Sequence, residues 1–284
     1  MTEILKNALY VVGTPIGNLE DITFRAVRIL QQVDLIAAED TRHTGKLLQH
    51  YQIKTAQISY HQHNHQQRVG ELLQHLATGK SLALVTDAGM PGISDPGYDL
   101  VRACVESGFL VIPIPGVTAA ITALSASGLP TEQFVFVGFL PPKSKDKKEH
   151  LANLKSAKRT IIFYASPHHL VATLNDLGTM LGVERKIVLA RELTKLHEEF
   201  WRGTIAEAIA LYAQQRQPKG EYTLVVAGSS QSEKIQLDDS QLKAELRQLI
   251  QQGMTRSQAS RQLAQLTSLP RRHLYQLSLE IEEE

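Results

Sequence analysis

The stretch LALVTDAGMPGISDPGYDLV, residues 82–101, joins an apolar run to a helix-like pattern through an unusual turn. The run 82–86 has the length and composition of a buried strand, and an amphipathic pattern resumes after the turn. Between them lie three glycines, two prolines and two aspartates. Glycines let a backbone approach a ligand closely, so the stretch predicts a strand, a binding turn and a helix of an α/β sheet.

The same alternation extends through the first 130 residues on both sides of this turn. Buried strands are expected at 8–13, 33–38, 56–60, 82–86 and 109–114, with clear helical patterns at 22–32 and 65–79. Strands that alternate with helices predict a mostly parallel sheet covered on both faces.

A second series of strands and helices follows. Strands are expected at 134–140, 159–165, 186–193 and 221–228, and helices near 146–156, 167–181 and 204–216. The proline-containing basic segment 139–148 is expected to be an exposed loop, and 229–240 has the composition of a linker. We predict an N-terminal α/β domain over 1–117, a C-terminal α/β domain over 118–230 and a helical module over 240–284.

Composition narrows the class of protein. The 284 residues are 43% hydrophobic and 21% charged, which is the balance of a globular chain. A formal net charge of +1 means that a polyanion would need a local basic patch. The single cysteine, Cys104, excludes intrachain disulfides and is expected to be an inert core thiol. With no apolar run near 20 residues and no signal-peptide pattern at the start, we expect a cytoplasmic protein without membrane contact.

Three turns rich in small residues follow predicted strands: VGTPIGNLEDIT at 12–23, TDAGMPGISDPG at 86–97 and the start of PIPGVTAAITALSASGLP at 113–130. None is a dinucleotide fingerprint or a Walker loop. Asp87 would repel a phosphate and suits a ligand with hydroxyl or ammonium donors. A purely structural alternative treats Asp95 as a helix N-cap with Pro96 in the first helical position.

These three motifs and AAEDTRHTGKLL at 37–48 together resemble the tetrapyrrole-methylase superfamily of S-adenosylmethionine-dependent methyltransferases. The likeness extends from about residue 8 through the helical tail and is strongest to the branch that 2′-O-methylates cytidine 1402 of 16S ribosomal RNA. It implies a two-domain class III methyltransferase with a mixed C-terminal sheet. It also implies S-adenosyl-L-methionine as cofactor, 16S rRNA or the small ribosomal subunit as partner, and a homodimer.

The resemblance implies a set of cofactor-binding residues around the ends of the strands. These are Pro15, Asp87, Ala88, Gly89, Ile93, Ser94, Thr118, Ala119, Tyr164, Ala165, Leu193 and Tyr222. After the strand that ends at Ala165, members of this branch commonly have Glu-Ser-Pro-His-Arg, where this chain has Ala-Ser-Pro-His-His.

Candidate catalytic groups lie in EDTRHT, directly after the second predicted strand. Arg42 suits a phosphate, and Asp40 or His43 would orient or deprotonate a ribose hydroxyl. The alternative is an N-cap followed by solvated charges.

Two surface clusters are candidates for RNA contact. His61 and Asn64 lie in SYHQHNHQQR, which also resembles a metal-binding histidine pattern without its acidic member, so no metal is expected. Lys143 and Lys145 lie in the basic loop, where solvation alone is the competing explanation.

The tail has six basic residues and one acidic residue between 241 and 273 and the spacing of a helix–turn–helix, with Ala259, Leu263, Leu266, Leu274 and Leu277 as expected core. Arg271 and Arg272 are its candidate RNA contacts. A DNA-binding regulator is therefore a second class of function, and a tetrapyrrole methyltransferase is the alternative enzyme.

Overall fold

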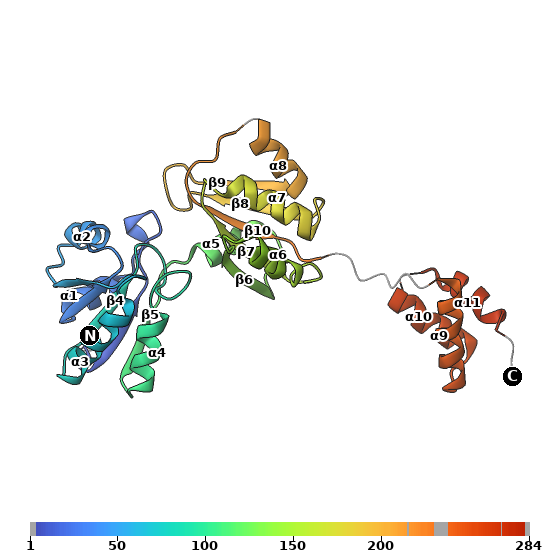
Figure 1. Ribbon diagram of the computed structural model, residues 1–284, viewed down its shortest axis with the longest axis horizontal. Coiled ribbons are helices and arrows are strands. Elements are labelled where there is room, and N and C mark those ends of the chain that lie inside the picture. Colours follow the sequence, from blue (N-terminus) through green and yellow to red (C-terminus); the bar gives the residue numbers. More distant parts are fainter. Residues whose placement is uncertain (1–3, 215, 230–237, 268, 282–284) are drawn as a thin grey trace. The chain divides into compact units, whose positions relative to one another are not determined.

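A computed structural model describes residues 4–214, 216–229, 238–267 and 269–281. The chain forms two compact units, Met1–Gly228 and Ser229–Glu284. Both sheets belong to the first unit and three helices form the second (Figure 1).

The first sheet is parallel throughout, as its sequence pattern predicts. Its order is β3-β2-β4-β1-β5. The strands are β1 (Ala8–Val12), β2 (Leu35–Ala38), β3 (Gln57–Ser59), β4 (Leu82–Val85) and β5 (Leu110–Ile114). The inner strands β1 and β4 are buried along their whole length. The edge strands β3 and β5 are not, and Leu110 is 57% exposed, so the expectation of five buried strands is wrong at both edges.

Helices cover both faces of this sheet because successive strand residues point to opposite sides. On one face Tyr10, Ile36 and Ala83 pack against α1 (Phe24–Gln32) and α2 (Thr41–His50). On the other, Leu9, Ala37 and Leu84 pack against α3 (His65–Ala77) and α4 (Tyr98–Glu106). Because the strands are parallel, their carboxyl ends lie on one edge of the sheet. The loops that follow β1, β2, β4 and β5 meet at this edge.

The second sheet is mixed, with the order β6-β7-β10-β8-β9. Only β6 and β7 run parallel among its pairs of described strands. Its strands are β6 (Phe134–Phe139), β7 (Thr160–Ala165), β8 (Lys186–Arg191), β9 (Glu199–Thr204) and β10 (Tyr222–Val226). The sequence pattern missed β9, because EFWRGT follows a charged turn and alternates without a clear apolar face.

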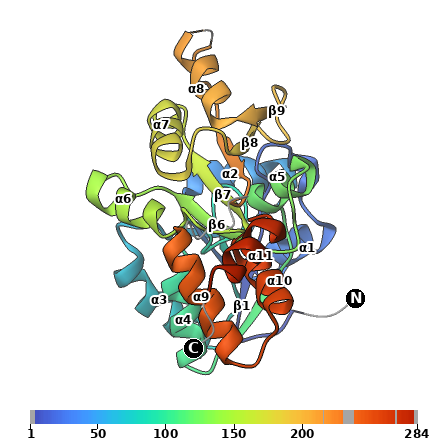
Figure 2. The same cartoon turned by 90° about the vertical axis from the view of Figure 1, so that its right-hand side faces the viewer.

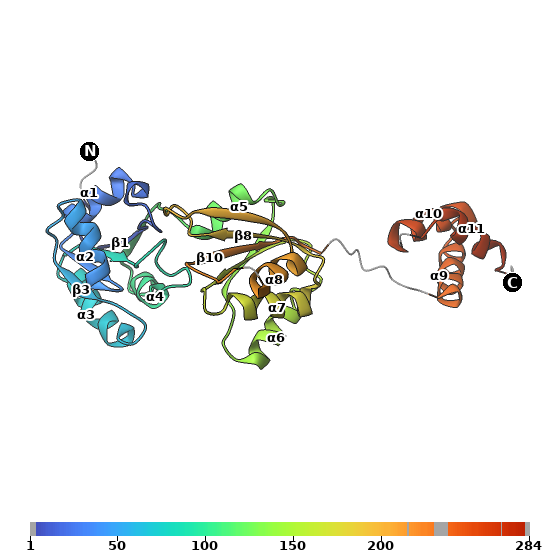
Figure 3. The same ribbon diagram turned by 90° about the horizontal axis from the view of Figure 1, so that it is seen from above.

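One face of the second sheet carries α6 (Ser144–Ala152), α7 (Leu170–Leu181) and α8 (Ile205–Gln214), with α7 and α8 side by side (Figure 2). The opposite face carries α5 (Ala119–Ser127) (Figure 3). The expectation of a loop over 139–148 is wrong from Ser144 onward, because α6 begins there. Its Lys147 forms an ion pair with Asp176 of α7 at 2.7 Å, which fixes the helix on the sheet.

The second unit contains α9 (Asp239–Gln251), α10 (Arg256–Thr267) and α11 (Arg271–Leu279) around a small core. Ala259, Leu263, Leu274 and Leu277 are buried as expected, but Leu266 is 57% exposed. Leu242, Leu246 and Ile281 fill that core instead. The expected linker lies mostly outside the described residues.

Two further findings bear on the class of protein. No helix in the described part of the chain is long and apolar enough to cross a membrane. Cys104 is fully buried in α4, which confirms its expected core position, and burial raises the pKa of its thiol to about 11.

Two loops touch at the carboxyl edge of the first sheet through glycines. A Cβ atom added to Gly116 would lie 2.7 Å from the Cα of Gly13, which is inside any allowed contact distance. We expect Gly116→Ala to lower the free energy of unfolding by about 1–3 kcal/mol, because backbone on both sides has to move. Urea denaturation followed by circular dichroism measures the change.

Gly70→Ala provides the matched control. Gly70 lies inside α3 with nothing within 4 Å of the added Cβ, so alanine should stabilise the protein by roughly 0.5–1 kcal/mol. If both variants had the stability of the wild type, the glycine contact would not constrain the fold.

Candidate active site

A cavity of about 310 Å³ lies in the first unit and is lined by loops of the first sheet and by strand ends of the second. Eleven of the twelve residues that the resemblance implies for a cofactor line this one cavity. They are Asp87, Ala88, Gly89, Ile93, Ser94, Thr118, Ala119, Tyr164, Ala165, Leu193 and Tyr222. Residues from both halves of the unit, more than 100 positions apart, therefore converge on one space.

Pro15 is the exception, and the backbone pairing of its loop explains why. Thr14 and Gly89 exchange two backbone hydrogen bonds of 3.0 Å, and the Thr14 hydroxyl donates to the carbonyl oxygen of Thr86 at 3.0 Å. With Thr14 held in this way, Ile16 lines the main cavity. Pro15 lines a second cavity of about 30 Å³ beside His43.

The main cavity is strongly acidic. Glu39, Asp87, Asp95 and Glu221 all line it, and Lys195 is the one cationic side chain among its described lining residues. Lys195 already forms ion pairs with Glu192 at 2.9 Å and Glu221 at 2.8 Å. The cavity therefore favours a ligand with positive charge or hydrogen-bond donors.

Asp95 does not cap a helix, contrary to the structural alternative drawn from the sequence. The N-cap of α4 is Gly97, at φ 152°, and it makes no side-chain capping bond. The Asp95 side chain lines the cavity instead. Burial, together with repulsion from Glu39, Asp87 and Glu221, raises the pKa of Asp95 to about 7.

Glu39 and Asp87 are coupled through the backbone at the ends of β2 and β4. The backbone N–H of Asp87 donates to Glu39 Oε2 at 3.3 Å, and that of Asp40 donates to Asp87 Oδ1 at 3.2 Å. Burial raises the pKa of Glu39 as well. These two hydrogen bonds join the loop after β2 to the loop after β4 at the cavity.

The predicted catalytic residues lie beside the main cavity and do not line it. The Asp40 carboxylate caps α2 by accepting the N–H of Arg42 at 2.8 Å, and it also pairs with the Arg42 guanidinium at 2.7 Å. These bonds hold the pKa of Asp40 well below its usual range, so Asp40 is suited to orienting Arg42 and not to accepting a proton. Arg42 is 88% exposed, and His43 lines the small cavity.

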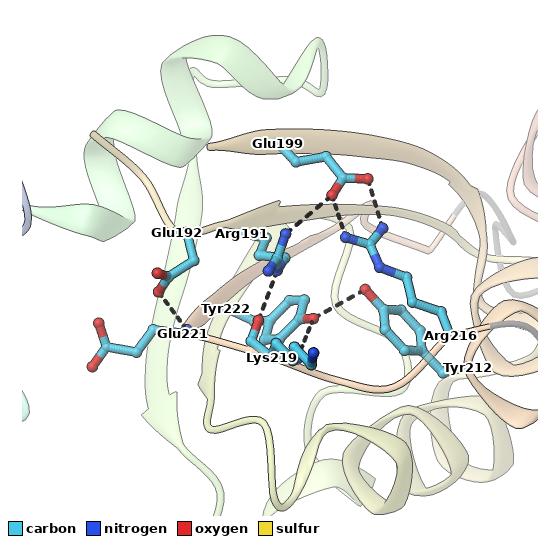
Figure 4. Close-up of polar contacts among 8 residues, drawn as sticks. All are labelled: Arg191, Glu192, Glu199, Tyr212, Arg216, Lys219, Glu221 and Tyr222. Carbon is cyan, nitrogen blue, oxygen red and sulfur yellow. Dashed lines mark hydrogen bonds and ion pairs between the residues drawn. The ribbon is translucent and has the colours of Figure 1, made fainter. Parts of the chain in front are cut away.

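Tyr222 is positioned by a network behind the cavity wall (Figure 4). Its hydroxyl lies 3.2 Å from that of Tyr212 and accepts the N–H of Lys219 at 3.3 Å. Arg216 stacks over the Tyr212 ring at 5.8 Å and pairs with Glu199 of β9. The strand that sequence patterns missed therefore anchors a wall of the cavity.

Tyr164 is held on the opposite side of the second sheet. Its hydroxyl accepts the N–H of Ala120 at 3.2 Å, and its ring meets Phe139 edge-on at a centroid distance of 5.5 Å. Phe139 lines the cavity too, which no sequence pattern indicated.

The predicted RNA contacts of the first unit do not line the cavity. Asn64 is used within its own turn, since its amide accepts the N–H of His61 at 2.8 Å and donates to Ser59. Lys143 is the N-cap residue of α6 and Lys145 lies in its first turn, both exposed. In the second unit, Arg271 donates to the Ser257 hydroxyl at 2.8 Å and Arg272 is exposed. Within the described residues, no group of His, Cys, Asp or Glu is arranged to hold a metal ion.

Three charged groups of the cavity were not among the predicted cofactor-binding residues: Glu221, Lys195 and Asp95. Asp95 had a signal, because an aspartate beside two glycines with positive φ lies in a turn that approaches a ligand. Lys195 had a signal too, because RELTKLHEEF at 191–200 is a charged strand end that could touch cofactor or acceptor, with a salt-bridged turn as the alternative. Glu221 had none, because it reaches the cavity only through pairing of β8 with β10.

Comparison with known proteins identifies the family. Residues 8–209 match the Tetrapyrrole (Corrin/Porphyrin) Methylases. The fold is similar to that of a uroporphyrin-III-C-methyltransferase from Thermus thermophilus, at 21% identity and a TM-score of 0.56, covering 78% of this chain and 94% of that one. A uroporphyrin-III C-methyl transferase from the same organism in complex with S-adenyl homocysteine is 18% identical, with a TM-score of 0.55, over 78% of this chain and 97% of that one.

Full-length relatives are much more similar. The ribosomal RNA small subunit methyltransferase I of Synechocystis sp. is 60% identical over 96% of this chain and 98% of its own. The proteins of the same name from Halalkalibacterium halodurans and Escherichia coli O157:H7 are 47% and 46% identical, each over 96% of this chain and 94% of their own. The chain therefore belongs to the ribosomal RNA small subunit methyltransferase I family, within the tetrapyrrole methylases.

Proposed function

We propose that this protein transfers a methyl group from S-adenosyl-L-methionine to the 2′-hydroxyl of a cytidine in 16S ribosomal RNA, cytidine 1402 by resemblance. The observation that carries the proposal is 60% identity along almost the whole chain, tail included, to a ribosomal RNA small subunit methyltransferase I. The geometry of the cavity supports it independently.

The cavity fits the chemistry of this cofactor. Asp87 and its neighbouring carboxylates complement an ammonium and a sulfonium group, while Ile16, Ile93 and Leu193 offer apolar contact to the rest of the molecule. The turn at Ala88 and Gly89 brings the backbone itself to the lining, and Gly89 has a φ of 86°, which glycine adopts without strain. When bound, the cofactor supplies an electrophilic methyl group.

The contribution of the protein to the reaction is mainly positioning. Holding the ribose hydroxyl in line with the methyl group supplies much of the rate of such a transfer. We assign Arg42 to a phosphate of the acceptor nucleotide, because its guanidinium is exposed and is oriented by Asp40. His43, next to Arg42 on the same helix, is the candidate for taking up the hydroxyl proton.

The alternative, methylation of a tetrapyrrole, has less support. The two solved tetrapyrrole enzymes compared above share the fold of this chain, but their sequences are only 21% and 18% identical to it. They cover 78% of this chain, whereas the rRNA methyltransferases cover 96%. A basic helical tail is suited to binding a long polyanion such as RNA. Methylation of a porphyrin-type substrate does not need such a tail.

We also propose that the enzyme works in the cytoplasm as a homodimer. The family resemblance supports the dimer, and a ribosomal substrate supports the location. A dimer has twice the 31.5 kDa mass of one chain. Multi-angle light scattering of the purified protein measures this mass.

The function is tested on the RNA itself. Purified small subunits or 16S rRNA from a strain lacking the protein should gain one 2′-O-methylcytidine when incubated with the protein and S-adenosylmethionine. Mass spectrometry of nuclease fragments locates the modified nucleotide. Transfer to a porphyrinoid and none to RNA would favour the alternative enzyme.

Asp87→Ala should weaken binding of S-adenosylmethionine by about tenfold or more, because a charge-assisted contact is lost in a partly buried site. Isothermal titration calorimetry measures this, with circular dichroism to verify folding. Asp99→Ala is the control, since Asp99 is exposed on α4 outside the cavity lining. Equal affinities in the two folded variants would remove Asp87 from the cofactor site.

Arg42 and the tail arginines should affect different kinetic constants. Arg42→Ala should lower turnover at saturating RNA, because it acts at the reacting nucleotide. Replacing Arg271 and Arg272 with alanine should weaken RNA binding and reduce its salt dependence, by roughly one unit of slope for each lost phosphate contact.

Steady-state kinetics at several salt concentrations separates these two effects. Gln276→Ala, on the exposed side of α11, controls for changes in the tail surface that remove no charge. If Arg42→Ala altered only RNA affinity, or if the double tail variant left binding unchanged, this division of roles would be wrong.

A further inference from the structure

Asp95 differs from the other carboxylates of the cavity. Glu39 accepts a backbone N–H from Asp87, Asp87 accepts one from Asp40, and Glu221 pairs with Lys195. Within the described residues, the Asp95 carboxylate accepts no hydrogen bond and forms no ion pair. It lines the cavity with nothing in the protein to balance its charge.

We propose that Asp95 gives up a proton to solvent when S-adenosylmethionine binds, and that the resulting carboxylate makes the cavity prefer this cationic cofactor to the uncharged product S-adenosylhomocysteine. The inference rests on the proposed function, since it assigns a role to one residue of the same cofactor site.

The charges around Asp95 explain why the empty cavity retains the proton. Negative groups face it from three segments: Glu39 after β2, Asp87 after β4 and Glu221 before β10. Lys195 lies between Glu192 and Glu221, which already neutralise it, and the hydroxyl of Tyr164 from β7 is uncharged at neutral pH. Burial, and then repulsion by these three carboxylates, makes a fourth negative charge unfavourable here and raises the pKa of Asp95 to about 7.

A bound cation reverses this balance. S-adenosylmethionine carries a sulfonium, an ammonium and a carboxylate, for a net charge of +1, whereas S-adenosylhomocysteine lacks the sulfonium charge and is neutral overall. The added positive charge lowers the pKa of Asp95 and the proton leaves to solvent. Once the methyl group has been transferred, the sulfur is neutral, the carboxylate loses its partner and the product is held less tightly.

The direction of the pH dependence follows from linkage. Below pH 7 the cofactor has to displace a proton from Asp95, and above pH 7 it does not. Affinity for S-adenosylmethionine should therefore rise by about five- to tenfold between pH 6 and pH 7.5 and then level off. Affinity for S-adenosylhomocysteine should change much less.

Calorimetry in buffers of different ionisation enthalpy counts the protons released on binding. At pH 6.5 the wild type should release about three quarters of a proton with S-adenosylmethionine and clearly less with S-adenosylhomocysteine. Asp95→Asn should release none from this site and should narrow the preference for the cofactor over the product. Asp146→Asn, an exposed aspartate of α6 outside the cavity lining, should behave as the wild type.

The outcomes separate this inference from the proposed function. If the wild type bound no S-adenosylmethionine, the proposed function would fail. If it bound the cofactor but Asp95→Asn released as many protons as the wild type, the role of Asp95 would be wrong while the cofactor site stood.

The stability of the ligand-free protein provides a second measurement. The folded protein holds the Asp95 proton more tightly than the unfolded chain, so this group contributes stability at low pH that is lost as the pH rises through about 7. The melting temperature of the wild type should fall more than that of Asp95→Asn between pH 5.5 and pH 8. Parallel curves would contradict the assignment.

Discussion

The backbone pairing of Thr14 with Gly89 is the contact on which the site depends. Two reciprocal hydrogen bonds join the loop after β1 to the loop after β4, although their residues are 75 positions apart. The close approach of Gly13 to Gly116 adds the loop after β5 to the same assembly. Parallel strands place these loops at one edge. Backbone contacts then hold them together, and the Thr14 hydroxyl adds a hydrogen bond to the carbonyl oxygen of Thr86.

Loops of both sheets form the cavity region with residues in a strained backbone conformation. Ser94, Glu192 and Thr194 adopt positive φ values of 64°, 49° and 64°, which residues with a Cβ atom rarely do. Glycines on the facing segments leave room for them: a Cβ on Gly138 would meet the Ser94 hydroxyl at 2.7 Å, and one on Gly17 would meet that of Thr194 at 2.8 Å. Strain of this kind concentrates where a binding site has to be held in one conformation.

Charge is distributed locally in a way that the net value of +1 conceals. The cavity gathers four carboxylates from three separate segments, while exposed cations of the same unit such as Arg42 and Lys145 do not line it. The proposed function, with a small cationic cofactor and a polyanionic substrate, requires this separation, because each surface would repel the ligand of the other.

The sequence by itself determined most of the fold and which residues surround the cavity. Periodicity predicted the parallel sheet because buried strands and amphipathic helices have distinct spacings. Glycine-rich turns predicted the position of the cavity, because glycine lets the backbone come close to a ligand. The family resemblance added Tyr164, Leu193 and Tyr222 to the predicted cofactor-binding residues, and these three line the same cavity as Asp87. Their role in binding the cofactor stays a prediction.

Only the tertiary structure decided the electrostatics of the site. Asp95 has the sequence context of a helix N-cap, yet α4 begins three residues later. Asp95 lines the cavity instead. Glu221 and Lys195 reach the same space because β8 pairs with β10, a contact between residues about 30 positions apart. The pKa of a carboxyl depends on burial and on charges within a few ångströms, and those distances are set by packing, which no local pattern encodes.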